Sequence, residues 1–351
     1  MAGLYVHIPF CAQKCIYCAF NSYAGKNELI AEYTKRVVSE LYEYKPFDVE
    51  TVYFGGGTPT YIPEGYIINI LDSVFRYCNV SSDAEVTIEA NPGTVTLNKL
   101  KKLKNAGFNR ISIGFQSFDN SELRTLSRIH TAKQGVEAVN LAREAGFSNI
   151  SGDIMTALPN QTLEALDKTI DKILDLELEH ISAYSLTVEE GTPLYSSNLK
   201  EMLPDEDTER KMYHYVVERL KNAGYGHYEI SNFAKKGFES RHNSSYWTGK
   251  EYVGLGAGAH SYYGGKRYSN AEKPELYINN APRENIYIVD EEEKRKEHIF
   301  LGLRMMRGIR YEQNPKTDKM IAAGLLKLEN GYISLTDRGI DISNYVFSEL
   351  I

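Results

Sequence analysis

The chain has 351 residues, of which 42% are hydrophobic and 25% are charged, and its formal net charge is −7. This length allows one large core together with a smaller second unit. The acidic excess and the lack of a long basic run argue against nucleic acid as a partner. No apolar run reaches the roughly 20 residues of a membrane span, and the first residues do not resemble a signal peptide, so we expect a cytoplasmic protein.

Short apolar segments alternate with longer segments of helical period over the first 230 residues. Residues 27–44 and 131–146 show the 3.6-residue apolar period of helices. The predicted strands are residues 3–8, 49–54, 84–90, 110–115, 149–155 and 180–186. This alternation predicts parallel strands joined by right-handed crossovers. We therefore expect an α/β fold, namely a partial (β/α)6 barrel of the TIM type, with a doubly wound open sheet as the alternative.

Small and polar residues follow the predicted strands. Ligands gather at the carboxyl ends of parallel strands, so these residues predict one shared site. Taken singly, each also has an ordinary role as a turn former or cap. After the strands come a cysteine loop, GGGTPT from Gly55, then Glu89, Asn91 and Pro92, then Gln116 and Ser117, with Asp153 inside the fifth strand.

Three of the four cysteines, Cys11, Cys15 and Cys18, form a C-x3-C-x2-C motif. Clustered cysteines in a long cytosolic chain indicate metal binding or catalysis rather than disulfides. A 4Fe-4S cluster held by three thiolates leaves one iron free to bind another molecule. Zinc with His7 as the fourth ligand is the alternative. Cys78 ends a predicted helix and is expected to be a small buried apolar residue.

The cysteine motif followed by GGGTP resembles the radical S-adenosylmethionine (SAM) superfamily. More closely, the chain is similar to the group that contains oxygen-independent coproporphyrinogen III dehydrogenase (HemN) and the haem chaperones of the HemW family. The matching segments, in order, are LYVHIPFCAQKCIYC, YFGGGTPT, IEANPGT, GFQSF, LSRIH, DIMTALP, RHNSSYW and GLGAGAHSY. HemW is favoured because Phe20 stands where HemN has a further cysteine, and because the first strand begins near residue 3, without the N-terminal extension of HemN. In addition, residues 242–247 fit the H-N-x-x-Y-W signature of HemW.

The resemblance implies a 4Fe-4S cluster on the three cysteines, with SAM bound at the open iron. Three of the implied SAM positions, Gln116, Arg128 and Asp153, match residues that surround a second SAM molecule in HemN. Two of them also have ordinary interpretations, since Arg128 would suit a surface ion pair and Gln116 a buried backbone group. No catalytic residue is assigned. The full implied set is Tyr5, Tyr17, Gly56, Gly57, Thr58, Glu89, Gln116, Arg128 and Asp153.

The HemW resemblance further implies haem as a carried ligand, client haemoproteins such as those of the respiratory chain, and a reductant protein for the cluster. His242, Tyr246 and Trp247 are the candidate haem contacts, because imidazole ligates haem iron and flat rings pack on the macrocycle. The same motif also suits a capped helical turn, and His260 is the second candidate. Oxidative decarboxylation of coproporphyrinogen III and a zinc-stabilised binding protein are the alternative functions.

We expect three segments along the chain: a radical SAM core barrel at 1–230, a connecting region bearing the H-N-x-x-Y-W motif at 231–282, and a C-terminal HemN/HemW-like domain at 283–351. In the last segment, helices precede a hairpin predicted at Asn330-Gly331, which is typical of a winged helix. Its 11 Lys and Arg and 12 Asp and Glu give a net charge of −1, which does not favour DNA binding. A lid over the barrel mouth or a contact surface for client proteins is expected instead.

Overall fold

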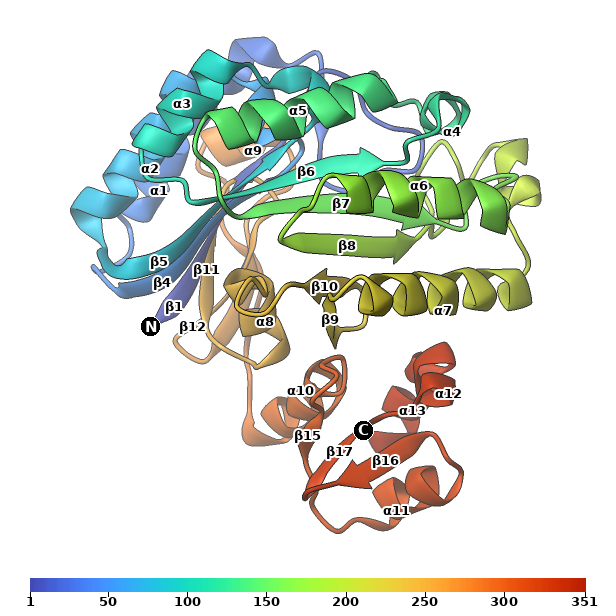
Figure 1. Cartoon of the computed structure of the whole chain (residues 1–351). Helices are drawn as coiled ribbons and strands as arrows, with labels where there is room; N and C mark the ends of the chain where they lie inside the picture. Colours follow the sequence, from blue (N-terminus) through green and yellow to red (C-terminus); the bar gives the residue numbers. More distant parts are fainter.

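The computed structural model describes residues 1–351. Its centre is a run of seven parallel strands that curves into an incomplete barrel (Figure 1). From one side to the other these strands are β11 (Tyr252–Leu255), β1 (Ala2–Ile8), β4 (Asp48–Gly56), β5 (Asn79–Ala90), β6 (Arg110–Gln116), β7 (Ile150–Thr156) and β8 (His180–Ser185).

All six predicted strands are confirmed, as β1, β4, β5, β6, β7 and β8. Their spatial order follows the chain without a reversal. A doubly wound sheet reverses its order at a switch point, so the barrel prediction is the correct one of the two. The seventh parallel strand, β11, was not predicted.

Antiparallel strands extend both sides of the parallel run. On the β8 side lie β10 (Asn232–Ala234) and β9 (Gly226–Glu229), and on the β11 side lie β12 (His260–Tyr263), β13 (Lys266–Ser269) and β14 (Glu284–Ile288). Residues 231–282 thus add four strands to the main sheet. The segment boundaries at residues 230 and 282 stay predictions.

Helices cover the outer face of the parallel strands (Figure 1). The predicted helix at 27–44 is a short 3-10 turn, Asn27–Leu29, followed by α1 (Ile30–Leu41), and the one at 131–146 is α5 (Ala132–Glu144). Thr131 and Gln134 form a reciprocal capping box at the start of α5. The others are α2 (Glu64–Tyr77), α3 (Leu97–Asn105), α4 (Asn120–Thr125), α6 (Leu163–Asp175), α7 (Glu206–Asn222), α8 (Arg241–Trp247) and α9 (Pro274–Ile278), with 3-10 turns at Pro59–Tyr61, Pro92–Thr94 and Asn198–Met202.

The strand β6 shows how the sequence divides the core from the interior of the barrel. Ile111, Ile113 and Phe115 are fully buried in the main apolar core, where they meet residues of α5. Side chains alternate across a strand, so Arg110, Ser112, Gly114 and Gln116 form the other face of β6. All four line one cavity inside the barrel. Apolar packing therefore lies outside the strands and polar side chains lie within.

The C-terminal segment has its own apolar core. The predicted hairpin is confirmed, with Asn330 and Gly331 at φ of 51° and 79°, the left-handed values that a two-residue hairpin loop requires. The elements are α10 (Glu291–Gly302), β15 (Ile309–Arg310), α11 (Pro315–Ala322), β16 (Leu326–Glu329), β17 (Tyr332–Leu335), α12 (Asp337–Asp341) and α13 (Ser343–Leu350). No helix of the chain has the length and apolarity needed to cross a membrane.

Candidate functional site

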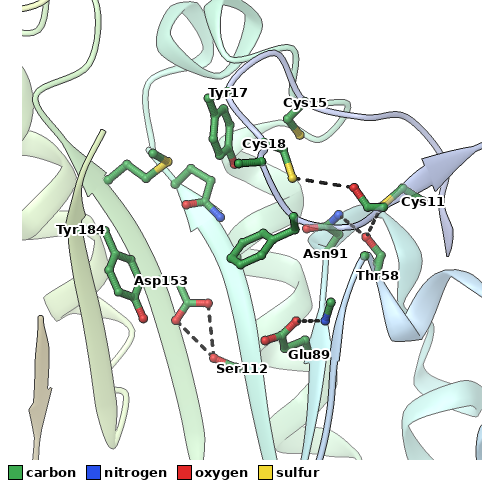
Figure 2. A pocket seen from close by; sticks show the side chains of 18 of the residues that line it. Cys11, Cys15, Tyr17, Cys18, Thr58, Glu89, Asn91, Ser112, Asp153 and Tyr184 are labelled. Atoms are coloured by element: carbon green, nitrogen blue, oxygen red, sulfur yellow. Dashed lines mark hydrogen bonds between the residues drawn. The ribbon is translucent and has the colours of Figure 1, made fainter. Parts of the chain in front are cut away.

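A cavity of about 490 Å³ opens at the carboxyl ends of the barrel strands. Its lining comes from the cysteine loop and from β4, β5, β6, β7 and β8 (Figure 2). Among the predicted cluster and SAM residues, Tyr5 alone does not line it. Those that do are Cys11, Cys15, Tyr17, Cys18, Gly56, Gly57, Thr58, Glu89, Gln116, Arg128 and Asp153.

Each of the three motif sulfurs has a polar neighbour. The Sγ of Cys11 lies 3.5 Å from the Thr58 hydroxyl, and that of Cys18 lies 3.8 Å from the Ser22 hydroxyl. Burial raises the pKa of Cys11. The Arg128 guanidinium donates to the Sγ of Cys15 at 3.7 Å.

The glycine-rich turn after β4 holds the cysteine loop in place. The amides of Gly57 and Thr58 donate to the carbonyls of Ile8 and Phe10, both at 2.9 Å. A Cβ on Gly57 would lie 2.8 to 2.9 Å from the backbone of residues 8–10. Gly56 has φ of 111°, and a Cβ there would meet the ring of His7. Gly57 is therefore required by the approach of the chain's own backbone, and Gly56 by its left-handed backbone and by the ring of His7.

The cysteines fit a polynuclear cluster better than a single zinc ion. No three His, Cys, Asp or Glu side chains in the chain come together closely enough to hold one metal ion. A cluster takes each thiolate at a different iron, so its ligands stand further apart. His7 is turned away, with Nε2 2.7 Å from the Asn21 carbonyl and Nδ1 2.9 Å from the Tyr5 hydroxyl. Both ring nitrogens of His7 are therefore engaged, which disfavours the Cys3His zinc alternative.

The fourth cysteine lies outside the site, as predicted. Cys78 follows α2 and is 6% exposed within the main apolar core. Its burial raises the pKa of its thiol to about 11, so the side chain is neutral near pH 7. Cys78 is a packing residue.

Arg128, Asn91 and Thr58 form a hydrogen-bonded chain beside the cysteines. Arg128 donates to the Asn91 side-chain oxygen at 2.5 Å and to the Gly114 carbonyl at 2.6 Å. Asn91 in turn donates to the Thr58 hydroxyl at 2.9 Å. Arg128 has no ion pair with a surface acid, so that ordinary interpretation is wrong. The guanidinium instead links β6, the turn after β5 and the cysteine loop.

Two partly buried carboxyl groups lie deeper in the cavity (Figure 2). Glu89 accepts hydrogen bonds from the Tyr53 hydroxyl at 2.8 Å and from the Gly56 amide at 3.1 Å. Burial raises the pKa of Glu89 to about 7. Asp153 accepts from the Ser112 hydroxyl at 3.2 Å, and burial raises the pKa of Asp153 as well. Both acids thus gain protons more readily than exposed ones.

Gln116 lines the cavity because β6 ends in an irregularity. The pairing with β7 shifts register between Gly114 and Gln116, and Gln116 has φ of 68°. Left-handed backbone is unusual for a non-glycine residue and gathers at functional sites, as do bulges. The strained end of β6 therefore lies at the cavity. No hydrogen bond links the Gln116 side chain to a buried backbone group.

The H-N-x-x-Y-W motif forms α8, which closes the amino end of the barrel. His242 is 1% exposed, and its Nδ1 and Nε2 each lie 2.8 Å from a hydroxyl, of Thr51 and Tyr246 respectively. Burial lowers the pKa of His242 to about 3. The His242 ring stacks on Tyr53 at 5.0 Å. A helix cap is present as expected, although the capping residue is Ser240.

The candidate haem contacts do not share one open surface. Trp247 lies against the C-terminal segment, with the Arg304 guanidinium 4.4 Å from its ring centroid. None of His242, Tyr246, Trp247 and the second candidate His260 lines the cavity. Tyr5, the predicted SAM residue that lies outside the cavity lining, has its ring centroid 6.5 Å from that of His242. The role of these residues in haem binding stays a prediction.

The C-terminal segment does not cover the cavity, so the lid expectation is wrong. No residue of 283–351 lines it. The segment instead contacts the barrel at β9, where Glu229 forms an isolated antiparallel β-bridge with Met305. The loop after β8 borders the mouth, with Leu186, Thr187 and Glu189 in the lining. The amide of Leu194 in this loop donates to the Ile16 carbonyl, which ties the loop to the cysteine loop.

Sequence reasoning missed the residues of the lower cavity. Position after a strand was the signal for the site, whereas these side chains point inward from within the strands or from α8. Counting back by twos from Gln116 along β6 would have found Ser112 and Arg110. The missed lining residues include Tyr53, Arg110, Ser112, Ser182, Tyr184 and Asn243.

Comparisons with known proteins agree with this geometry. Residues 5–173 match the Radical SAM superfamily. The chain is 38% identical to "Heme chaperone HemW" of Bacillus subtilis (strain 168) over 100% of this chain and 99% of that protein. It is 34% identical to the protein of the same name from Lactococcus lactis subsp. lactis (strain IL1403), over 99% of this chain and 96% of the relative.

A solved structure, the radical SAM enzyme coproporphyrinogen III oxidase (HemN) from Escherichia coli, has the same fold. It superposes with a TM-score of 0.87 over 99% of this chain and 89% of that chain, at 21% sequence identity. At this identity the likeness concerns the fold alone.

Proposed function

Because the chain belongs to the HemW family of the radical SAM superfamily, we propose that it is a haem chaperone, which binds haem and delivers it to client haemoproteins. Similarity to HemW proteins along the whole chain is the observation that carries this proposal. The cavity supports it, because cysteines, glycines and carboxyl groups meet there in the pattern typical of a radical SAM protein.

Cys11, Cys15 and Cys18 would hold a 4Fe-4S cluster, with SAM at the remaining iron. Together these groups supply one-electron chemistry when bound. Arg128 donates a hydrogen bond to the sulfur of Cys15, and the backbone of Gly57 fixes the cysteine loop. Tyr17, Gly56, Thr58, Glu89, Gln116 and Asp153 would form the remaining contacts to SAM.

Haem binding through the H-N-x-x-Y-W motif is a separate part of the proposal. The lowered pKa of His242 keeps the imidazole neutral, which is the form that ligates metal. Both of its nitrogens are within hydrogen-bond distance of hydroxyl groups, and α8 holds it beneath the barrel. His242 would therefore reach haem iron only after α8 moves and the hydrogen bond at the ligating nitrogen breaks.

An anaerobic reconstitution tests the proposal. The protein is supplied with iron and sulfide, titrated with haem by absorbance, and then mixed with an apo-haemoprotein to measure transfer. We expect saturable haem binding and transfer to the acceptor. Lack of saturable binding would contradict the chaperone function.

The same preparation tests the alternative function, oxidative decarboxylation of coproporphyrinogen III, which the shared fold with HemN suggests. With SAM and a reductant present, we expect no sustained formation of protoporphyrinogen. Robust turnover would replace the chaperone proposal with the dehydrogenase.

A further inference from the structure

The hydrogen-bonded chain from Arg128 to the cysteine loop has a fixed direction. A guanidinium has only donors, so the side-chain oxygen of Asn91 must face Arg128, and it lies 2.5 Å away. The amide nitrogen of Asn91 therefore faces Thr58 and donates to its hydroxyl at 2.9 Å (Figure 2). The Thr58 hydroxyl has a single hydrogen of its own, which stays available for another acceptor.

The sulfur of Cys11 is that acceptor. The Oγ1 of Thr58 lies 3.5 Å from the Sγ of Cys11, and Thr58 does not use its side chain to cap the 3-10 turn that follows it. Both residues are buried, so water has little access to this pair. A sulfur that ligates iron is a thiolate, and a thiolate can only accept. Thr58 is therefore the donor once Cys11 holds a cluster.

A second branch leads from Arg128 to Cys15 directly. The Nη1 of Arg128 lies 3.7 Å from the Sγ of Cys15, while its Nη2 donates to Asn91. One guanidinium thus reaches Cys15 through one hydrogen bond and Cys11 through three. The remaining cysteine of the motif has a different neighbour, the hydroxyl of Ser22, which is outside this chain.

These contacts have a consequence for the redox properties of the site. Hydrogen bonds to the ligand sulfurs are among the factors that set the reduction potential of an iron–sulfur cluster. Reduction adds one electron, and part of its negative charge falls on the sulfurs. Donors aimed at the sulfurs therefore stabilise the reduced form more than the oxidised form. A cation at the head of a chain of hydrogen bonds strengthens each bond in it.

We propose that Arg128, Asn91 and Thr58 form a relay that raises the reduction potential of a cluster held in part by Cys11 and Cys15. Arg128 is a positioning residue in this relay, because it orients the Asn91 amide and through it the Thr58 hydroxyl. The role rests on the proposed cluster site and goes beyond it by naming the side chains that set its potential. It requires neither haem nor SAM.

A redox titration tests the relay. The full-length protein is reconstituted anaerobically with iron and sulfide and titrated with dithionite without SAM, and the reduced cluster is followed by electron paramagnetic resonance. Arg128→Met should lower the ratio of reduced to oxidised cluster at a fixed potential at least about tenfold, which is about 59 mV for one electron. Thr58→Val should shift the midpoint in the same direction by less, and Thr58→Ser, which keeps the hydroxyl, should stay near the wild type.

Two controls separate the relay from a general effect of charge. Lys14→Gln removes a cation from the cysteine loop whose ammonium donates to the Phe20 carbonyl and not to a sulfur, so the midpoint should stay near that of the wild type. The charge of Arg128 also acts on the Asp153 carboxyl. The double variant Arg128→Met, Thr58→Val isolates the relay from that effect, because two members of one chain should together shift the midpoint by less than the sum of the single shifts.

The relay is overturned if Arg128→Met and Thr58→Val keep the wild-type midpoint at wild-type iron content. It is also overturned if Lys14→Gln shifts the midpoint as far as Arg128→Met does, or if the two single shifts simply add. Should Arg128→Met take up no iron, the comparison of Thr58→Val with Thr58→Ser decides. A wild-type protein that takes up no iron and sulfide contradicts the cluster itself and the relay with it, whereas unchanged midpoints contradict the relay alone.

Discussion

Each end of the barrel carries a clear sequence motif, but one motif borders an open cavity and the other is buried. At the carboxyl end, the C-x3-C-x2-C loop and the glycine-rich turn border an open cavity. At the amino end, both ring nitrogens of His242 lie within hydrogen-bond distance of hydroxyl groups, and His242 is 1% exposed. A sequence motif therefore indicates that its side chains are held in a fixed arrangement. A binding site is indicated by an open cavity and by polar side chains without partners.

The largest expected effect concerns the cysteines at the carboxyl end. Replacing Cys11, Cys15 or Cys18 by alanine should abolish the iron and sulfide content after reconstitution, because each thiolate supplies a separate ligand. Cys78→Ala is the control and should keep the wild-type iron content, at a cost of about 1 kcal/mol in stability. Iron retained in Cys15→Ala, or lost in Cys78→Ala, would move the cluster site away from this loop.

The glycine-rich turn gives the next largest effect. Gly57→Ala would bring a Cβ to within 2.8 Å of the backbone that leads into the cysteine loop. We expect a loss of about 1–3 kcal/mol together with a lower iron content. Gly65→Ala is the matched control, since Gly65 lies in α2 with no neighbour within 4 Å. It should keep the iron content, and alanine should favour the helix by a few tenths of a kcal/mol.

At the amino end, His242→Ala should chiefly affect stability. It removes both hydrogen-bonding contacts of the ring and leaves a cavity beside Tyr53. We expect chemical denaturation to show a loss of about 2–4 kcal/mol.

His260→Ala, at an exposed site, should change stability by less than about 0.5 kcal/mol. Wild-type stability in His242→Ala would contradict the closed packing. Loss of haem binding by His242→Ala while it remains folded would support the predicted ligand role.

The last expected effect is a pH dependence from Glu89. Burial raises the pKa of Glu89 from 4.5 to about 7. Between these values the folded chain keeps a proton that the unfolded chain has released, so the Glu89 contribution to stability falls as pH rises through this window. Glu89→Gln should therefore gain stability over the wild type at pH 8 relative to pH 4.5, by up to about 3 kcal/mol.

Glu64→Gln is the control of opposite sign. A hydrogen bond from Lys102 lowers the pKa of Glu64 below its ordinary value, so Glu64 stabilises the fold above that pH. Its replacement should cost more stability at pH 8 than in acid. Chemical denaturation at pH 4.5 and pH 8 measures the free energy of unfolding of each variant relative to the wild type. If Glu89→Gln changes this free energy equally at both pH values, Glu89 does not titrate as described.

Local sequence patterns predicted the parallel strands and the carboxyl end of the site well. Strand and helix periods identify β1, β4, β5, β6, β7 and β8, and position at or after the end of a strand identifies Cys11, Gly57 and Glu89. They could not predict that Tyr252–Leu255 would pair with β1, because four residues carry little periodicity and the pairing spans the whole chain. Likewise, the H-N-x-x-Y-W sequence gives no sign that Thr51 approaches the His242 ring.

The central claim is an open iron in a cluster bound by Cys11, Cys15 and Cys18. Electron paramagnetic resonance of the reduced, anaerobically reconstituted protein, recorded with and without SAM, tests this claim. We predict a 4Fe-4S signal that changes when SAM is added, because SAM binds one iron of the cluster. A signal indifferent to SAM, or a colourless protein filled with zinc, would contradict it.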